Sequence, residues 1–369
     1  MKTVDDLREA LDYPFDAPAP DTMAIIAGAR RRRVARRALV GSGLACVAGG
    51  VAVAILVNGA PSRHDLGPDP TGEAPNPVLV AATSPLTRTV PDRFDPLTRT
   101  LSIGWVPAGL IDQQAEITPW SQTYSGFDAS HVNGGPDVGL VVEVLAKGRP
   151  VSDLSDGALG LPPFAVSHPT EPVNGQPAEC LSPPEAPRSC PAIRWQYAPE
   201  SWARVSYAGS AAGADTVARR VAEAVSLTAG EPVRLPFTLS GAPAAMTAAR
   251  TRVDIYRNGS TGMSGERWSA SIDLVSDLQT GGPGRLSIET MQRPDDPSGR
   301  TGRDTAPNTT VAGHPAWRQS DGAALVVWGI SGTRTVVGFR DQPGDAETTF
   351  TDVHVLPSPD DPAHWAAVH

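Results

Sequence analysis

A run of uncharged residues, 38–57 (ALVGSGLACVAGGVAVAILV), limits what the N-terminal part of this chain can form. A helix rises about 1.5 Å per residue, so a helix of this length would match the roughly 30 Å hydrocarbon core of a bilayer. Arginines crowd its N-terminal flank: Arg30, Arg31, Arg32, Arg33, Arg36 and Arg37. Because positive residues stay on the cytoplasmic side, the pattern predicts a transmembrane helix with residues 1–37 inside and 58–369 outside. The predicted location is the cell membrane, with a single pass.

Three export signals remain alternatives for this run. A cleaved signal peptide has an apolar region of about 7–15 residues and a small-residue cleavage site; here the nearest such site is followed by Pro61. A lipoprotein signal would use Cys46, but the leucine before it is one position late and the apolar run continues past it. Arg36 and Arg37, followed by Ala-Leu-Val, are similar to the core of a twin-arginine signal.

The charge and composition of the chain limit which partners and which kind of source genome are expected. All of its 31 basic residues except Lys2 and Lys147 are arginine, and it has 36 glycines and 37 prolines. Such a bias is typical of a GC-rich bacterial genome, as in actinobacteria. Acidic residues outnumber basic ones in the part beyond residue 57, which argues against nucleic acid as a partner.

Three further segments are expected to lie outside the folded blocks. Residues 1–37 form a cytoplasmic tail with room for two short helices, and residues 358–369 form a C-terminal tail. Residues 58–97 contain eight prolines and almost no periodic apolar pattern, so they read as a hydrated linker.

Two blocks of similar sequence, 98–228 and 229–357, fill most of the remaining chain. The pattern V-x-G-x-P-A occurs at 173–178 and again at 311–316. Pro107 precedes the first copy by 66 residues, and Pro243 precedes the second by 68. The predicted fold class is α+β: an N-terminal transmembrane helix followed by two tandem repeats, each an antiparallel sheet with a helix on one face.

The expected elements follow from local periodicity. Alternating apolar residues predict strands at 101–110, 138–145, 193–197 and 202–207 in the first block, and at 252–256, 268–275, 286–290, 324–329 and 334–339 in the second. Residues 215–225 predict an amphipathic helix, for which 345–356 is the counterpart.

These motifs carry a resemblance. A strand with W-x-P-x-G-L, a further strand, V-N-G-x-P-A, an I-x-W hairpin and an amphipathic helix, all within 98–228, resemble a small domain of unknown function. That domain recurs in extracytoplasmic parts of bacterial anti-sigma-type proteins and lipoproteins, and it is distantly similar to the half-barrel of lipoprotein-carrier and sigma-factor-regulator proteins. The arginine block and apolar run are similar to those of many single-pass actinobacterial membrane proteins. The second block departs at its opening, with Gly241-Ala-Pro243 in place of Trp-x-Pro. The resemblance implies fold and topology and assigns no catalytic residue.

Two of the three cysteines predict a disulfide. Cys180 and Cys190 lie in the part expected outside the cytoplasm, in an insertion that the second block lacks. An oxidising compartment favours a bridge between such a pair, and two cysteines alone make a poor zinc site. We therefore expect the bridge between Cys180 and Cys190.

The other chemistry-bearing residues form no catalytic or metal-binding pattern. No Gly-x-Ser-x-Gly elbow and no phosphate-binding loop occurs. The sequence therefore predicts no catalytic residue, no metal site and no cofactor. The histidines are scattered, and the tryptophans in strand patterns are expected in the core: Trp105, Trp195, Trp202, Trp268, Trp317 and Trp328.

These observations predict a non-catalytic, membrane-anchored protein that senses or binds an envelope ligand or protein partner outside the cytoplasm. One alternative is an anti-sigma-like regulator, which would act on a cytoplasmic transcription factor through residues 1–29. Another is an envelope hydrolase, which would need a nucleophile and a base converging in a cleft.

Overall fold

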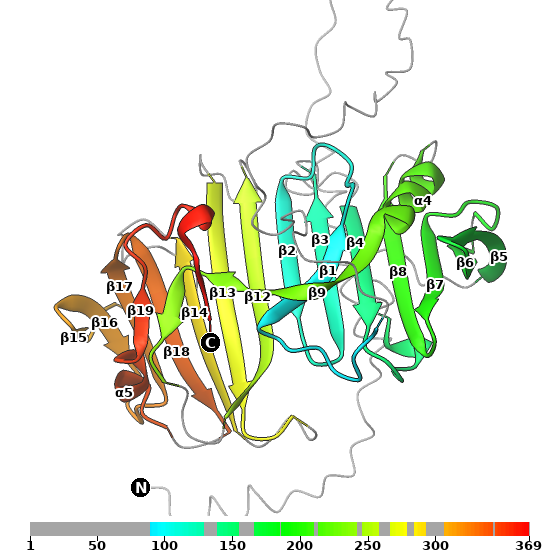
Figure 1. Cartoon of the computed structure of the whole chain (residues 1–369). Helices are drawn as coiled ribbons and strands as arrows, with labels where there is room; N and C mark the ends of the chain where they lie inside the picture. Colours follow the sequence, from blue (N-terminus) through cyan, green and yellow to red (C-terminus); the bar gives the residue numbers. More distant parts are fainter. Residues whose placement is uncertain are drawn as a thin grey trace, which may run out of the picture. The chain divides into compact units, whose positions relative to one another are not determined.

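Strands dominate the part of the chain that the computed structural model describes, which is residues 89–128, 139–154, 166–184, 186–209, 213–241, 246–257, 266–278, 284–292, 306–341 and 344–368. Of these residues 56% lie in strands and 10% in helices. Fourteen strands from both sequence blocks form one antiparallel sheet (Figure 1). The predicted α+β class with a separate sheet for each block is therefore wrong, because the two blocks pair edge to edge.

The elements of the first half run from residue 98 to residue 232. They are β1 (Thr98–Ile103), β2 (Asp112–Ile117), β3 (Ser121–Phe127), β4 (Gly139–Leu145), the 3₁₀ turn η1 (Val151–Asp153), β5 (Val166–Val173), β6 (Gln176–Ser182), β7 (Ala192–Ala198), β8 (Ser201–Ala208), α4 (Ala214–Ala224) and β9 (Val225–Pro232).

The elements of the second half follow directly. They are β10 (Arg234–Leu235), β11 (Phe237–Leu239), β12 (Thr247–Arg257), β13 (Glu266–Val275), β14 (Arg285–Gln292), β15 (Thr309–Val311), β16 (His314–Arg318), β17 (Ala324–Ile330), β18 (Thr333–Arg340), α5 (Ala346–Phe350), β19 (Val353–Val355), the 3₁₀ turn η2 (Pro362–His364) and β20 (Ala366–Ala367).

The strand order is the same in both halves when it is counted outward from the middle of the sheet. The order is β2-β3-β4-β8-β7-β6-β5 on one side and β12-β13-β14-β18-β17-β16-β15 on the other. The middle is an antiparallel pairing of β2 with β12, in which Glu116 lies opposite Arg252. We call this pairing the seam. The boundaries 98–228 and 229–357 themselves stay a prediction.

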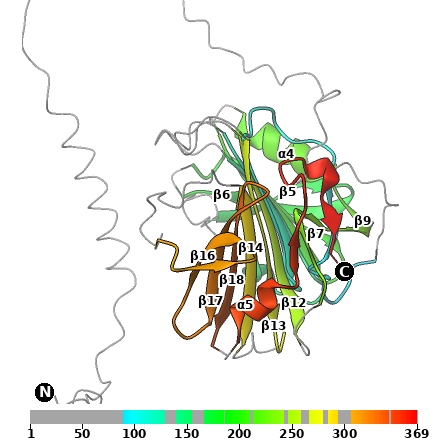
Figure 2. The same cartoon turned by 90° about the vertical axis from the view of Figure 1, so that its left-hand side faces the viewer.

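A second layer covers one face of the sheet. The chain segment that contains β9, β10 and β11 crosses this face, pairing in turn with β1, β20 and β19. Figure 2 shows α4, β9 and the red C-terminal segment on the same side of the sheet. Alternate residues of the sheet strands, such as Val142 and Ile272, are buried against this layer and form one core with it, because successive side chains of a strand point to opposite faces.

The V-x-G-x-P-A motifs form corresponding hairpin turns. Asn174 and Gly175 join β5 to β6 with φ angles of 49° and 78°. Ala312 and Gly313 join β15 to β16 with φ angles of 50° and 83°. Positive φ at both central residues is typical of the two-residue turns that suit the twist of a hairpin. The repeated motif therefore specifies a turn.

The helices match the sequence predictions unequally. The first helix, α4, buries Val217, Ala218 and Val221, as its apolar stripe predicts. The predicted helix at 345–356 is too long, because α5 ends at Phe350 and the chain then enters β19 to pair with β11.

The membrane part of the predicted fold class is also corrected. No helix among the described residues is long and apolar enough to cross a bilayer. The run 38–57, the tail 1–37 and most of the linker 58–97 lie outside the described residues. The fold class is therefore that of a mostly β protein.

Candidate functional site

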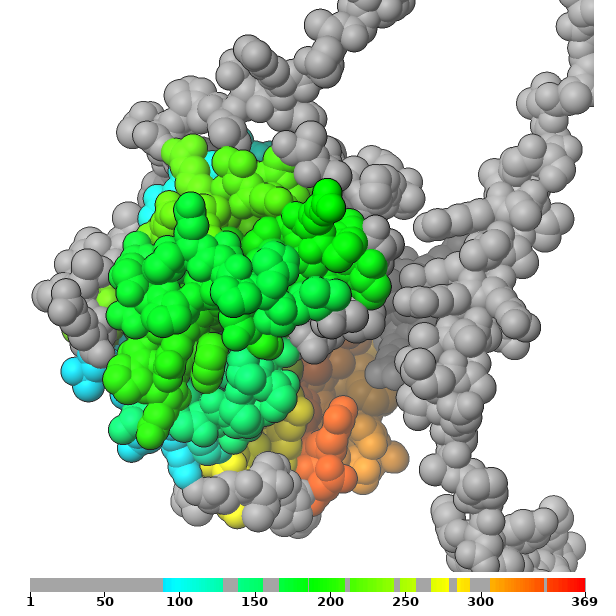
Figure 3. All heavy atoms as spheres, turned by 90° about the vertical axis from the view of Figure 1, so that its right-hand side faces the viewer, coloured from blue at the N-terminus to red at the C-terminus, as the bar shows by residue number. Residues whose placement is uncertain are grey.

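The predicted disulfide is present and closes a segment at the outer end of the first half. Cys180, on β6, and Cys190 are bonded, with 5.4 Å between their Cα atoms. The Ser182 hydroxyl donates to the Ser189 carbonyl at 2.5 Å. The Cys190 N–H donates to the Asp215 carboxylate, in the first turn of α4, at 2.7 Å. The segment is thus fixed to both β6 and the helix. Figure 3 views the molecule from this end, where the green atoms of the first half face the viewer.

The second half has a shorter connection at the corresponding place. Cys180 and Arg318 both lie two residues beyond the alanine of V-x-G-x-P-A, and they pair with Ile193 of β7 and Leu325 of β17. From Cys180 the chain takes residues 181–191 to reach β7, whereas from Arg318 it takes only 319–323 to reach β17. Among the described residues, the shorter connection leaves the space above β16 open.

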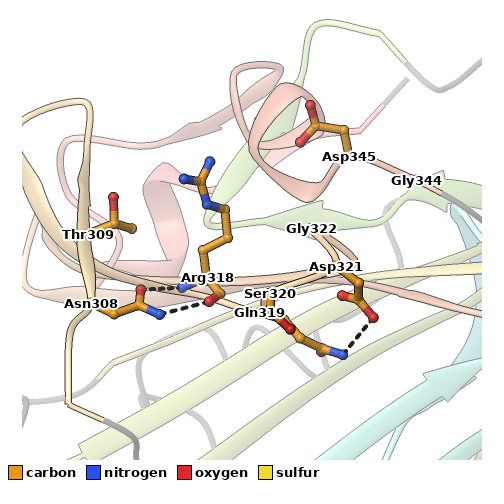
Figure 4. Close-up of a pocket in the computed structure, with 9 residues that line it drawn as sticks. All are labelled: Asn308, Thr309, Arg318, Gln319, Ser320, Asp321, Gly322, Gly344 and Asp345. Atoms are coloured by element: carbon orange, nitrogen blue, oxygen red, sulfur yellow. Dashed lines mark hydrogen bonds between the residues drawn. The ribbon is translucent and has the colours of Figure 1, made fainter.

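A polar hollow of about 550 Å³ occupies this position. Its walls come from the end of β16, the turn before β17, the start of β15 and the residues that begin α5 (Figure 4). The lining residues are Asn308, Thr309, Arg318, Gln319, Ser320, Asp321, Gly322, Gly344 and Asp345. This hollow is the candidate functional site.

Arg318 fixes the shape of the hollow through contacts on two sides. The Asn308 side chain accepts from the Arg318 N–H and donates to its carbonyl, each at 2.9 Å. The Arg318 guanidinium then reaches Glu347 of α5, with 2.5 Å between Nη1 and Oε2. Glu347 is the second residue of α5, as Asp215 is the second residue of α4. In each half an acidic side chain of the helix thus bonds the chain near this connection: Asp215 bonds Cys190 within it, and Glu347 bonds Arg318 at the end of β16.

The two aspartates of the hollow also serve its structure. Asp345 accepts from the N–H groups of Glu347 and Thr348 and thereby caps α5. The Thr348 hydroxyl also donates to Asp345, and these hydrogen bonds hold the pKa of the Asp345 carboxyl below its usual range. Asp321 accepts from the Gln319 side chain at 3.1 Å and from the Ala323 N–H at 2.9 Å. By contrast, the Ser320 and Thr309 hydroxyls have no hydrogen-bond partner among the described residues.

A row of residues in register crosses the other face of the sheet, away from the covering layer. Its members lie opposite one another from strand to strand, and we call them the charged row. From β6 to β16 they are Glu179, Arg194, Arg204, Glu143, Thr123, Glu116, Arg252, Ser271, Glu289, Val336, Val326 and Trp317.

Beside the row, a second group of ion pairs lies just beyond the seam. Arg252 bonds Asp254, with 2.8 Å between Nε and Oδ2. Burial raises the pKa of the Asp273 carboxyl, but hydrogen bonds from Arg285 and Ser287 and the charge of Arg250 outweigh it, so its pKa lies below the usual range. Asp273 is therefore ionised and fully engaged.

The pKa of the Glu289 carboxyl, by contrast, lies above its usual range. Burial raises the pKa of its carboxyl, and the neighbouring carboxylates of Asp254 and Asp273 raise it further. Arg334 and Arg252 act against this rise without cancelling it. The environment of Glu289 thus disfavours its charged form.

The remaining predicted residues do not converge on a site. Arg30, Arg31, Arg32, Arg33, Arg36 and Arg37 lie outside the described residues. No group of three or more His, Cys, Asp or Glu side chains in the described ranges could hold a metal ion. Four of the six tryptophans expected in the core are buried, and Trp202 and Trp317 are half-buried.

Sequence reasoning missed the hollow, although a signal for it was available. The two blocks differ in the number of residues between V-x-G-x-P-A and the next strand. The longer connection was interpreted through its cysteines, and the shorter one was not interpreted. The shorter connection opens the space.

Comparison with known proteins gives little. No protein-family profile and no curated protein matches the chain. Among solved structures, the crystal structure of MucB in complex with MucA(peri) is similar over 67% of this chain and 94% of that chain, at 11% identity and a TM-score of 0.21. At that score the similarity supports no statement on fold or function.

Proposed function

We propose that this chain is a non-catalytic binding protein that works outside the cytoplasm and holds its ligand in the polar hollow of the second half. The hollow is the observation that carries the proposal. It is wide enough for a ligand, and its rim is fixed from β15, β16 and α5.

The state of the charged groups around the hollow supports binding over catalysis. Arg318 is paired with Glu347, Asp345 caps a helix, and Asp321 holds its own turn. Because these side chains are already held by other groups of the protein, the surface is preformed, and this lowers the entropic cost of binding.

The disulfide supports a location outside the cytoplasm. Bridges persist in oxidising compartments and are rare where thiols are kept reduced. Alkaline phosphatase fused after His369 tests the location: we expect an active enzyme, and a silent fusion in a strain that produces the full chain contradicts it.

No observation on the described residues supports either of the two alternative functions considered from the sequence. Regulation of a cytoplasmic transcription factor would depend on residues 1–29, which lie outside the described ranges. For a hydrolase, His364 does meet Asp361, with 2.7 Å between Nδ1 and Oδ2, but their side chains are 70% and 51% exposed.

Photo-crosslinking tests the binding function. A photoreactive residue in place of Thr309, which lines the hollow without a hydrogen bond from its hydroxyl to another described residue, should give a light-dependent adduct in the full chain in its own cell envelope. The same residue in place of Glu171, exposed on β5 in the first half, is the matched control and should give none. Absence of an adduct at 309 in cells that carry the folded protein contradicts the proposal.

A further inference from the structure

The two halves show what kind of ligand suits the hollow. In the first half, the end of β6 is accompanied by a stretch of the chain itself, residues 183, 184 and 186–191, which the disulfide and the Ser182 hydroxyl hold there. In the second half, the space above the end of β16 is the hollow. Because the strand order and register are the same, the first half displays a polypeptide segment in the position that the second half leaves open.

The first-half segment consists of successive turns and contains three prolines before Cys190. The Ala186 N–H donates to the Pro183 carbonyl and the Ser189 N–H to the Ala186 carbonyl, each at 3.0 Å. Two groups of the surrounding half then hold it, the Ser182 hydroxyl and the Asp215 carboxylate.

Both holding groups have counterparts in the second half. Ser320 lies two residues beyond Arg318, as Ser182 lies two residues beyond Cys180, and Glu347 corresponds to Asp215. Ser320 is exposed in the hollow. Ser182 is buried at the end of β6, whereas Ser320 lies in the turn after β16, where its hydroxyl meets no other described residue.

The charge of the hollow specifies the ligand further. Arg318 is neutralised by Glu347, which leaves the carboxylates of Asp321 and Asp345 at the rim. The first-half segment carries the exposed basic residue Arg188. Complementary charge steers binding and sets specificity.

We propose that the hollow binds a proline-containing turn of a partner polypeptide that carries a basic side chain, in the position that the segment before Cys190 takes in the first half. This rests on the proposed binding function and narrows its ligand to a class. The Ser320 hydroxyl donates to a carbonyl of the turn, and the basic side chain faces Asp321 and Asp345.

A peptide probe tests the inference on the full chain. The probe is the disulfide-closed peptide CLSPPEAPRSC, which is residues 180–190 with a fluorescent label, and binding is followed by anisotropy. We expect saturable binding that weakens at least fivefold when the arginine of the peptide is replaced by glutamate. Lack of saturable binding by the folded full chain overturns the inference.

Matched variants locate the binding. Ser320→Trp fills the hollow and should weaken binding at least tenfold, whereas Ser358→Trp, at another exposed serine, should leave it unchanged. Equal binding by Ser320→Trp and the wild type overturns the inference. The crosslink at 309 separates the two proposals: an adduct with a glycan or lipid keeps the binding function and overturns the polypeptide ligand.

Discussion

The two halves of the sheet share one topology, yet their charged row differs beyond the third strand from the seam. That strand carries a glutamate in both halves, Glu143 in β4 and Glu289 in β14. Opposite Glu143 stands Arg204, and the two side chains, 5% and 2% exposed, lie 3.7 Å apart. Opposite Glu289 stands Val336. Hence one glutamate has an arginine across the strand pair and the other has an apolar side chain.

This difference shows which features the fold requires. The turns, the strand order and the apolar alternation recur in both halves, so they specify the architecture. The residues of the second face vary from ionic to apolar at equal register, so the shared strand order does not depend on any one set of them. The outermost members of the row show the same change. The first half has Glu179 and Arg194 where the second half has Trp317 and Val326.

The largest effect is expected when Arg204 is replaced by the residue at the corresponding position of the second half, which is Val336. Arg204→Val gives Glu143 the cross-strand neighbour that Glu289 has. Removing one partner of a buried ion pair costs about 3–5 kcal/mol, so the free energy of unfolding in urea should fall by about that amount. Arg194→Val copies Val326 at a more exposed pair and should cost less than about 1 kcal/mol. Similar losses in both variants would contradict the distinction between them.

The disulfide should have the next largest effect. Closing a loop of this length stabilises by about 2–3 kcal/mol. The double variant Cys180→Ala and Cys190→Ala should lose this amount in denaturant unfolding, and reductant should lower the stability of the wild type but not of the double variant. Cys46→Ala is the control and should keep the sensitivity to reductant. If the wild type is equally stable with and without reductant, the bridge does not restrain the segment.

The hairpin turns should show an effect of about 1 kcal/mol. Ala312 has a φ of 50°, a conformation that costs most L-residues roughly 1–2 kcal/mol and that asparagine tolerates better. Ala312→Asn copies Asn174 and should raise the unfolding free energy, while Asn174→Ala should lower it. Asn174→Ala also removes a hydrogen bond to the Glu223 carbonyl. Thermal unfolding of both variants checks the pair; changes of the same sign would break the equivalence of the turns.

The smallest effect is expected at Glu289, since neighbours of both signs partly offset each other. A carboxyl whose pKa is raised in the folded state stabilises the protein below the unfolded value, near 4.5, and loses that contribution as pH rises through the folded value. Glu289→Gln should therefore be more stable than the wild type at pH 7, and this advantage should shrink below about pH 4.5. Urea unfolding at several pH values measures it. Glu143→Gln, beside Arg204, is the control and should be less stable than the wild type at pH 7.

Local patterns in the sequence were sufficient for several parts of the fold. The V-x-G-x-P-A motifs identified the two turns, the apolar spacing identified α4, and the cysteines identified the bridge. Each of these features depends on residues close together in the chain.

The parts that failed depend on residues far apart in the chain. Nothing local to Glu116 or Arg252 reveals that β2 pairs with β12, so one shared sheet was read as two. β5, with its prolines at 169 and 172, has no alternating apolar pattern, because it lies at an edge of the sheet and only Val173 is buried. The hollow was missed for the same reason, since its walls come from three separate segments.

The seam has a consequence for how the chain reaches its folded state. An antiparallel pairing between corresponding strands is the contact that two identical subunits make about a two-fold axis. Here the segment 225–239 links the partners covalently, and a short tether raises the effective concentration of one partner around the other to the order of millimolar. A half released from its tether would present β2 or β12 as an open edge and would have to find its complement by diffusion. The covalent link thus replaces a concentration-dependent assembly with a folding step whose yield does not depend on dilution.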